Sequence, residues 1–375
     1  MAADFLERLK QSPVLCDGAM GTLLYAKGIF INRSYDELNL SQPDLIRGIH
    51  HDYLQAGAEI IETNTFGANS FRLARHSVAD KVRDINRAGV RLAREAAKSF
   101  DVWVAGSVGP LGTRIEPLGK TSYQEARDAF REQIQALVES GVDLLILETF
   151  GYLEEIHQAM LAARDVHPSI PIVAQVTIDE DGNCLDGSDP QTFTPKLAEW
   201  GADLIGCNCS VGPVAMLDAM ERVRALTSLP LSAQPNAGIP RSVDGRNIYL
   251  CSPEYMASYA RKFVAAGVRL VGGCCGTTPE HIRVMKSALR VGEARGRTAA
   301  ARSSTTQPAP PPIAAVPLEK RSPLGAKLAA GEFATMVEIV PPKGIDVSKE
   351  IEGARFLKSV GVDGVNIPDS PRASA

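Results

Sequence analysis

The feature that most limits the possible folds is a series of eight short apolar runs separated by longer amphipathic stretches. Each run is continuous, as expected for strands that are buried on both faces of a parallel sheet. The runs are residues 14–21, 58–67, 102–110, 143–150, 171–178, 203–210, 230–238 and 269–278. The stretches between them carry apolar residues at helical spacing, and several end in Gly before the next run. The pattern predicts repeated strand–helix units.

Eight such units match the (β/α)8 TIM barrel in number and in size. A doubly wound open sheet is the alternative fold, and it usually carries a Gly-rich dinucleotide loop after its first strand. The first run ends in DGAMGT, which is not that motif. We therefore predict a TIM barrel over residues 1–293, with its chemistry where the strands end and the βα loops begin.

A change of composition marks the end of the repeated pattern. Residues 294–322 are rich in Pro, Ala and Ser without periodicity, which is typical of a flexible linker. Residues 333–340 and 364–369 then have the pattern of strands, and 347–361 the pattern of a helix. One βαβ unit cannot bury both faces of a parallel sheet. We predict that residues 323–375 begin a second, incomplete barrel and that the chain is truncated from a longer protein.

Charge and hydropathy argue against two classes of partner. The net charge is −4 and no basic stripe is visible, which argues against nucleic acid. The N-terminus lacks the profile of a signal peptide, and no apolar run is long enough to cross a membrane. We expect a cytoplasmic protein, in which the seven cysteines are more often thiols or metal ligands than disulfides.

Three cysteines lie at the ends of two predicted strands. Cys209 ends the sixth run, and Cys274 and Cys275 end the eighth. Only one strand separates these two in a barrel, so their ends can converge over its mouth. The glycines around Cys274 and Cys275 let the backbone bend so that both thiols can reach one metal ion. Three thiolates favour zinc over magnesium or manganese, and they leave its fourth position open, as in catalytic sites.

Two other interpretations of these cysteines exist. They could be buried barrel residues that bind nothing, since cysteine is among the most buried residue types. Cys207 also competes with Cys209, because alternation would turn both toward the mouth, with Cys207 one layer deeper. We favour Cys209 because it lies nearer the strand end. We assign Cys16, Cys184 and Cys251 to packing or to loops, and none of the six histidines lies at a strand end.

Two acidic residues also end predicted strands. Asp17 ends the first run, and Glu148 ends the fourth. Either could hold a substrate ammonium, and the turn formed by Gly18, Ala19 and the residues up to Gly21 exposes amide N–H groups that can hold a carboxylate. Together they suit an α-amino acid, although either acid alone could cap a helix or form a salt bridge. The polar residues after the second and seventh runs could line the pocket, but we favour a role in satisfying loop backbone: Asn64, Thr65, Phe66, Gln234, Pro235 and Asn236.

The motifs DGAMGT, ETNTFGAN, GSVGP, ETF, GCNCSVGP, QPNAG and GGCCGTTPEHI, in this order, resemble those of the homocysteine S-methyltransferase family. In that family the cysteine of the NC pair and both cysteines of GGCC bind zinc. The resemblance therefore implies Cys209, Cys274 and Cys275 as ligands, in preference to Cys207.

The same resemblance implies that Asp17 and Glu148 hold homocysteine. It also implies zinc-dependent transfer of a methyl group to the homocysteine thiol, which gives methionine. S-methylmethionine, a betaine and methyltetrahydrofolate are donors used in the family. A non-enzymatic module that binds zinc through its thiols is the alternative function.

The segment VEIVPPK is similar to the start of a methylenetetrahydrofolate reductase domain. Such reductases carry a glutamate in this strand near the flavin, which corresponds to Glu338. The usual form is FEFFPPK, and Val337 and Ile339 depart from it. FAD is expected only if the rest of a reductase domain is present. Because such a reductase makes methyltetrahydrofolate, the segment favours a folate donor.

Overall fold

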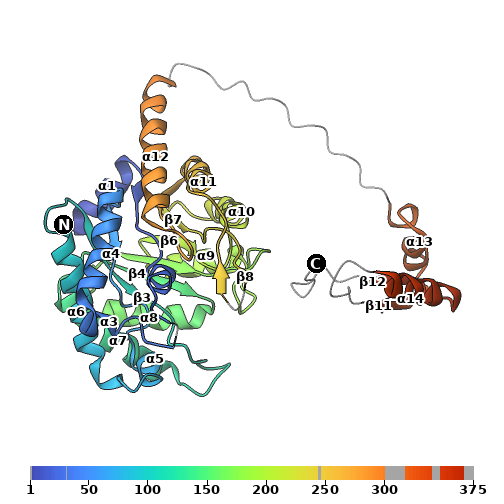
Figure 1. Ribbon diagram of the computed structural model, residues 1–375, viewed down its shortest axis with the longest axis horizontal. Coiled ribbons are helices and arrows are strands. Elements are labelled where there is room, and N and C mark those ends of the chain that lie inside the picture. Colours follow the sequence, from blue (N-terminus) through green and yellow to red (C-terminus); the bar gives the residue numbers. More distant parts are fainter. Residues whose placement is uncertain (1, 31, 244–245, 300–316, 340–346, 367–375) are drawn as a thin grey trace. The chain divides into compact units, whose positions relative to one another are not determined.

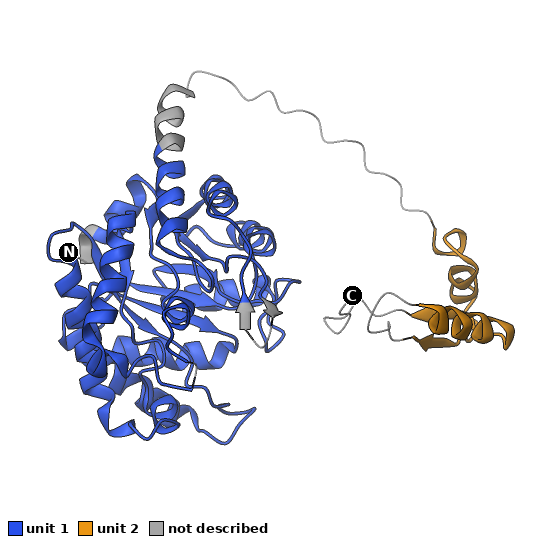
Figure 2. Ribbon diagram, viewed as in Figure 1, with its two compact units in different colours: residues 1–302 blue, residues 303–375 orange. Residues whose placement is uncertain are grey.

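The computed structural model describes all residues except 1, 31, 244–245, 300–316, 340–346 and 367–375. The chain divides into two compact units, residues 1–302 and residues 303–375, which are coloured separately in Figure 2.

The first unit is built around one sheet of eight parallel strands in the order β1-β10-β7-β6-β5-β4-β3-β2 (Figure 1). The strands are β1 (Val14–Leu15), β2 (Ile60–Glu62), β3 (Trp103–Val108), β4 (Leu144–Phe150), β5 (Ile172–Val176), β6 (Leu204–Asn208), β7 (Leu231–Gln234) and β10 (Val268–Val271). A parallel bridge between Cys16 and Ile60 joins β1 to β2 and closes the sheet. The predicted TIM barrel is confirmed, and the doubly wound sheet is wrong because the first and last strands in the sheet order pair with each other.

A long helix follows each barrel strand and covers its outer face (Figure 1). These helices are α4 (Pro43–Ala56), α6 (Val82–Ala97), α7 (Tyr123–Glu139), α8 (Leu153–Val166), α9 (Pro190–Glu199), α10 (Pro213–Arg224), α11 (Pro253–Ala265) and α12 (Pro279–Ala299). The start of α11 shows why such helices begin where they do. The Ser252 hydroxyl accepts the Tyr255 backbone N–H at 3.3 Å, and Pro253 occupies the first turn.

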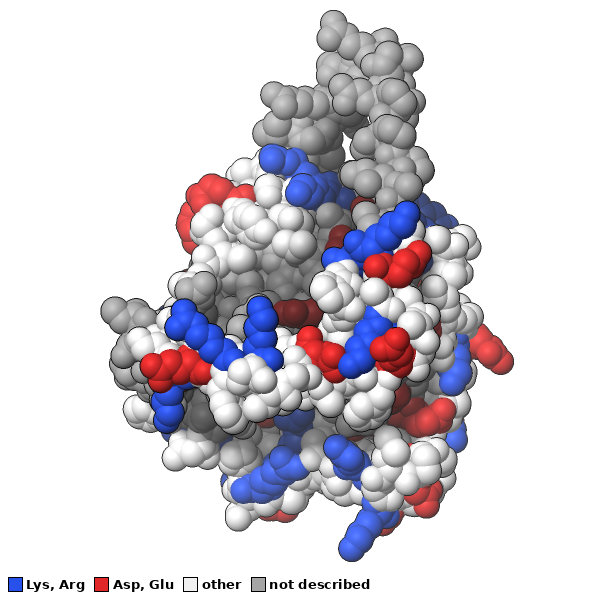
Figure 3. Space-filling view, turned by 90° about the vertical axis from the view of Figure 1, so that its right-hand side faces the viewer, with Lys and Arg blue, Asp and Glu red and all other residues white. Residues whose placement is uncertain are grey.

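Shorter elements lie in the loops of the barrel. They are α2 (Gly21–Ala26), α3 (Leu38–Ser41), α5 (Ser70–Ala74), the 3-10 helix η1 (Ala79–Lys81) and the antiparallel pair β8 (Arg241–Val243) and β9 (Arg246–Ile248). Among the described residues, no helix is both long and apolar enough to span a membrane. On the face shown in Figure 3, Lys and Arg side chains are interspersed with Asp and Glu.

The N-terminal end of the barrel is filled by α1 (Ala2–Gln11). Phe5 and Leu9 of this helix are fully buried against inward-facing residues such as Leu144 and Leu204, which begin their strands. The outward faces of the strands pack beneath the helices in a separate, larger core. Because one end of the barrel is closed by apolar packing, a cavity can open only at the carboxyl ends of the strands.

The second unit contains a small parallel sheet. Its strands are β11 (Met336–Glu338) and β12 (Gly364–Asn366), joined by α14 (Ser348–Ser359) and preceded by η2 (Leu318–Lys320) and α13 (Pro323–Ala329). The strand–helix–strand order predicted for this segment is confirmed.

Two sequence predictions fall partly outside the described residues. The Pro-Pro-Lys part of the reductase-like motif lies in 340–346, and most of the predicted linker lies in 300–316. At the start of that linker, α12 continues to Ala299. Glu338 is exposed on β11 and accepts the Asn366 side-chain N–H at 3.4 Å.

The plug of the barrel gives a first prediction. Replacing Phe5 by Ala should lower the free energy of unfolding by about 3–5 kcal/mol, because it opens a cavity beneath the inner layer. Lys10→Ala, on the exposed face of the same helix, should change it by less than about 0.5 kcal/mol. Urea denaturation of the two variants measures both values, and equal effects would show that α1 does not support the barrel.

Candidate metal centre and substrate pocket

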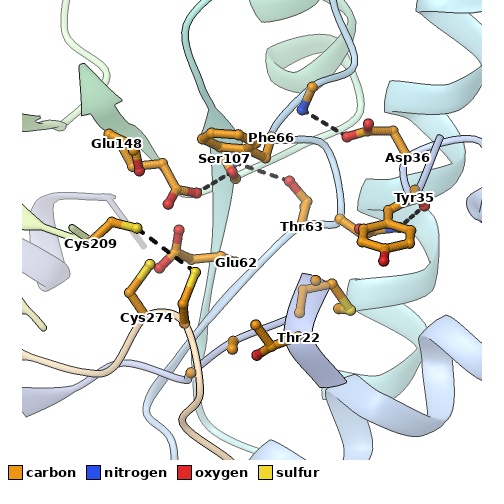
Figure 4. Close-up of a pocket in the computed structure, with 18 of the residues that line it drawn as sticks. Thr22, Tyr35, Asp36, Glu62, Thr63, Phe66, Ser107, Glu148, Cys209 and Cys274 are labelled. Carbon is orange, nitrogen blue, oxygen red and sulfur yellow. Dashed lines mark hydrogen bonds between the residues drawn. The ribbon is translucent and has the colours of Figure 1, made fainter. Parts of the chain in front are cut away.

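A cavity of about 550 Å³ opens at the carboxyl ends of the barrel strands. Its walls come from the ends of seven strands and from the loops that follow them. In Figure 4, Cys209 and Cys274 lie on one side of this cavity, Tyr35 and Asp36 lie on the other, and Glu62 and Glu148 lie close to the cysteines. The arrangement divides the cavity into an inner end near the thiols and an outer end near the loops after β1 and β2.

The three cysteines predicted as ligands meet at the inner end. The Sγ atoms of Cys209 and Cys275 are 3.8 Å apart, and those of Cys209, Cys274 and Cys275 all lie within 4.8 Å of one another. Cys274 and Cys275 lie in the turn after β10 rather than in the strand itself. This turn is fastened to the loop after β7, because Cys274 N donates to Pro235 O and Ala237 N donates to Cys275 O, both at 2.9 Å.

The backbone at the end of β6 decides which cysteine faces the cavity. Cys209 and Ser210 have φ values of 59° and 56°, in the left-handed region that ordinary residues rarely adopt. This turn breaks the strand alternation, so Cys207 and Cys209 do not point the same way. Cys207 packs in the core between strands and helices, and burial raises the pKa of its thiol to about 12. The expectation that Cys207 points to the mouth was wrong; the inward position belongs to Asn208.

The remaining cysteines take no part in the cluster. Cys16 and Cys184 are buried, Cys251 is half-buried, and none of the three lines the cavity. Within the cluster, the Cys275 thiolate accepts hydrogen bonds from the thiols of Cys209 and Cys274, which lowers the pKa of Cys275 to about 3. Hydrogen bonds of Cys274 with Cys209 and with Cys275, together with burial, raise the pKa of the Cys274 thiol. The cluster therefore favours a thiolate at neutral pH and suits a soft cation.

Asn208 fixes the acidic residue predicted on β4. Its Nδ2 donates to Glu148 Oε2 at 3.1 Å and to Thr149 Oγ1 at 2.9 Å, and its Oδ1 accepts the Thr149 N–H at 2.7 Å. Ser107 Oγ donates to the other Glu148 oxygen at 2.5 Å. Thr149 has a φ of 64°, another left-handed residue at the mouth. Sequence reasoning missed Asn208, although its place between the two cysteines of the GCNC motif marks it as the inward residue.

A second acid, Glu62, lies beside Asp17. Glu62 N donates to Asp17 Oδ2 at 3.0 Å, and Glu62 Oε1 accepts Gln234 Nε2 at 2.6 Å. Gln234 in turn accepts Gln175 Nε2 at 2.6 Å, so a chain of side-chain amides rises from the barrel interior to hold Glu62. Sequence reasoning missed Glu62 as well. The available signal was its position at the end of β2, which matches that of Glu148 near the end of β4.

Among the residues described, the three acids lie together without a cationic side chain beside them. Burial raises the pKa of Asp17 to about 8, and burial together with the Asp17 charge raises that of Glu62 to about 7. The pKa of Glu148 is raised by burial and then by Glu62. In the described part of the chain, no Lys or Arg forms an ion pair with any of them. A cationic group of a ligand, such as an ammonium, would balance this cluster.

The turn after β1 lines the cavity but is less open than its sequence implied. Ala19 N donates to Thr277 Oγ1 at 3.1 Å, and Ala19 O accepts the Tyr53 hydroxyl at 2.7 Å. A Cβ on Gly18 would come within 2.5 Å of Thr277 Oγ1, so only Gly fits there. The prediction that the Ala19 amide is exposed was wrong, because the loop after β10 supplies its acceptor.

The polar residues after the second and seventh strands divide between two roles. Asn64, Phe66 and Gln234 line the cavity, whereas the other predicted residues do not: Thr65, Pro235 and Asn236. Asn64 Nδ2 also donates to Tyr35 O at 2.7 Å, the expected role in satisfying loop backbone.

Comparison with known proteins identifies the domain that holds this cavity. The model of a family described as homocysteine S-methyltransferase matches residues 14–289, which include every residue of the inner end. The chain belongs to the homocysteine S-methyltransferase family. The match ends before the second unit, so the resemblance of that unit to a reductase stays a prediction.

Two curated relatives of this chain are methionine synthases. Those of Mycobacterium leprae and Mycobacterium tuberculosis are each 35% identical to this chain over 302 residues, which is 76% of the chain. The chain spans 25% of the length of either relative.

Among solved structures, the homocysteine methyltransferase MmuM of Escherichia coli is similar to this homocysteine S-methyltransferase domain. Its metallated form is 29% identical, with a TM-score of 0.63 over 74% of this chain and 96% of MmuM. Its oxidized form is 28% identical, with a TM-score of 0.63 over 73% of this chain and 95% of MmuM.

The acid cluster predicts how stability depends on pH. A carboxyl group whose pKa rises on folding stabilises the fold while protonated, and that stability is lost as the pH rises through the raised pKa. For Asp17 and Glu62, the free energy of unfolding of the ligand-free protein should therefore fall between about pH 4 and about pH 8. Glu62→Gln should remove roughly 1–3 kcal/mol of this fall, a value reduced because Glu62 is only half-buried in the cavity wall.

Urea denaturation at a series of pH values measures this effect. Glu7→Gln, at an exposed acid on α1, should leave the pH profile as in the wild type. An equally steep fall in the Glu62→Gln variant would show that folding does not raise the pKa of Glu62.

Proposed function

We propose that this chain transfers a methyl group to the thiol of homocysteine, giving methionine, at a zinc ion held by Cys209, Cys274 and Cys275. The observation that carries the proposal is the meeting of three thiols with three carboxylates in one cavity. The family supports this function, and so do the relatives, which are described as methionine synthases and a homocysteine methyltransferase.

The thiol cluster fits zinc in both chemistry and spacing. Tetrahedral zinc with Zn–S bonds of about 2.3 Å places its sulfur ligands about 3.8 Å apart. The Sγ atoms of Cys209 and Cys275 are 3.8 Å apart, which matches this spacing. When bound, zinc would act as a Lewis acid that keeps the homocysteine sulfur in its nucleophilic thiolate form. Three protein ligands leave one position for that sulfur.

The acids beside the thiols would orient the amino-acid end of the substrate. Asp17, Glu62 and Glu148 would surround the ammonium group of homocysteine, and its charge would balance the negative cluster. The carboxylate end would lie against Gly18 and Ala19, whose turn is held in place by the loop after β10. Such positioning lowers the barrier to methyl transfer, because the sulfur no longer has to find its orientation toward the donor.

The presence of the acids also weighs against the alternative function. A module that only stores zinc or undergoes thiol oxidation would need the three cysteines but would gain nothing from three neighbouring buried carboxylates. A site for a thiol-bearing amino acid needs both groups. We therefore favour an enzyme of methionine formation over a metal-storage protein.

The methyl donor in this proposal is methyltetrahydrofolate or S-methylmethionine. The similarity of the β11 segment to methylenetetrahydrofolate reductases favours the folate. Glu338 would then be part of a reductase site, and FAD binding would require more of that fold than the single βαβ unit described here.

Removal of one thiol tests the metal centre. Cys275→Ala should abolish zinc binding, from about one ion per chain, and with it methionine formation from homocysteine. Cys251→Ala, which changes a half-buried cysteine outside the cluster, should retain both properties. Metal analysis of the purified proteins and a methionine assay measure the two outcomes. Full activity of a zinc-free Cys275→Ala protein would contradict the proposal.

A second variant tests the acid cluster separately from the metal. Glu148→Gln should raise the KM for homocysteine about tenfold or more, because it removes a charged hydrogen-bond partner of the ammonium. The zinc content should stay at the wild-type level. Glu154→Gln, at a more exposed acid on α8, is the matched control. An unchanged KM in zinc-loaded Glu148→Gln protein would place the ammonium elsewhere.

A further inference from the structure

The two ends of the cavity differ in their ionisable side chains. The inner end holds Asp17, Glu62 and Glu148, whereas Arg33, Arg72 and His76 line the outer end together with one acid, Asp36. A volume of about 550 Å³ is typical of sites for drug-sized ligands, so homocysteine at the inner end leaves space beside it. The outer end therefore has both the room and the charge for a second, anionic group.

Arg72 is held rigidly at this outer end. Its Nε donates to Pro110 O at 2.7 Å, and its guanidinium carbon lies 5.0 Å from the centre of the Phe66 ring. The aliphatic part of the Arg72 side chain packs against Gly67 and Gly112. A Cβ atom added to Gly67 would lie 3.2 Å from Arg72 Cδ, and a Cβ atom added to Gly112 would lie 3.3 Å from Arg72 Cγ. Contacts from the loops after β2 and β3 thus fix the direction of the guanidinium before any ligand binds.

The tip of this arginine has no partner within the described part of the chain. Its terminal nitrogens make no hydrogen bond, and no carboxylate oxygen lies within 4.0 Å of them. The charges of Asp36 and Glu155 act to raise the pKa of the Arg72 guanidinium, but the carboxylate of each accepts a hydrogen bond from a backbone N–H. Asp36 accepts Gly67 N, and Glu155 accepts Leu111 N, both at 2.8 Å. A fixed guanidinium with both terminal N–H groups open suits two-pronged binding of a carboxylate.

We propose that the outer end of the cavity is the subsite for the methyl donor and that Arg72 binds a carboxylate of that donor. Arg33 also lines this end, but its half-exposed side chain forms a 3.5 Å ion pair with Glu37, so of the two arginines Arg72 is the one that is open to a ligand. The inference rests on the proposed function, since only a methyl-transfer reaction needs a second substrate here. S-methylmethionine and methyltetrahydrofolate both carry a carboxylate, so both satisfy the chemistry. A donor without an anionic group would leave the guanidinium unpaired.

Calorimetric titration of the zinc-loaded protein with S-methylmethionine, and separately with methyltetrahydrofolate, tests the subsite without turnover. The wild type should bind at least one donor. Arg72→Gln should weaken that binding about tenfold or more, and Arg72→Lys should weaken it less, because Lys keeps the charge but loses the two-pronged geometry. Arg75→Gln is the matched control: Arg75 also donates to a loop carbonyl, that of Gly112, but it is exposed and does not line the cavity.

A change in the ligand provides a second arm that does not depend on a variant. For the donor that binds, the derivative with its carboxylate converted to an amide should bind the wild type as weakly as the parent donor binds Arg72→Gln. Wild-type affinity in Arg72→Gln, or equal affinity of acid and amide, would overturn the inference. So would failure of the wild type to bind either donor.

Failure of the subsite is distinguishable from failure of the proposed function. Zinc content and the affinity for homocysteine should be the same in Arg72→Gln as in the wild type, because Arg72 touches neither the thiols nor the acids. If the wild type holds zinc and binds homocysteine while Arg72→Gln binds the donors normally, only the donor subsite is wrong. Absence of zinc and of homocysteine binding in the wild type would refute the proposed function itself.

Discussion

Closure of the barrel between β1 and β2 is the interaction on which the rest of the site depends. Asp17 N donates to Ile60 O at 3.0 Å, and the Asp17 side chain then accepts the N–H of Glu62, also at 3.0 Å. Asp17 and Glu62 are therefore themselves part of the pairing between β1 and β2 that closes the barrel. Once the seam is closed, the ends of all eight strands lie around one opening, and residues far apart in sequence share it.

Two departures from regular strand geometry turn this opening into a site. Thr149 and Cys209 both adopt left-handed φ values, which cost about 1–3 kcal/mol each and persist only where the surroundings enforce them. Asn208 supplies part of that enforcement, because it binds the backbone and hydroxyl of Thr149. The strain aims the Cys209 thiol at the cysteines of the β10 loop and keeps Glu148 beside them, so the thiol cluster and the acid cluster share one support.

Sequence patterns were most informative where burial dictates composition. Strands covered on both faces must be continuously apolar, so the eight runs located every barrel strand, and residues at their ends became candidates. Glu62, Asn208 and Arg72 escaped this reasoning for different reasons. Whether Glu62 and Asn208 face inward depends on strand register, which no single run reveals. Arg72 lies on a loop helix, and its open guanidinium is visible only once every neighbouring acceptor has been placed.

The sequence by itself determined the number of strand–helix units and the meeting of three cysteines with two acids at one end of a barrel, because hydrophobic periodicity and strand order are local properties of the chain. Only the tertiary structure decided that Cys209 rather than Cys207 reaches the cavity, and that the Ala19 amide is already paired with Thr277. Both outcomes depend on contacts between segments remote in sequence. The Cys209 N–H donates to Gln234 O at the end of β7, and the Ala19 N–H donates to Thr277 in the loop after β10. No local sequence pattern encodes which partner each group takes.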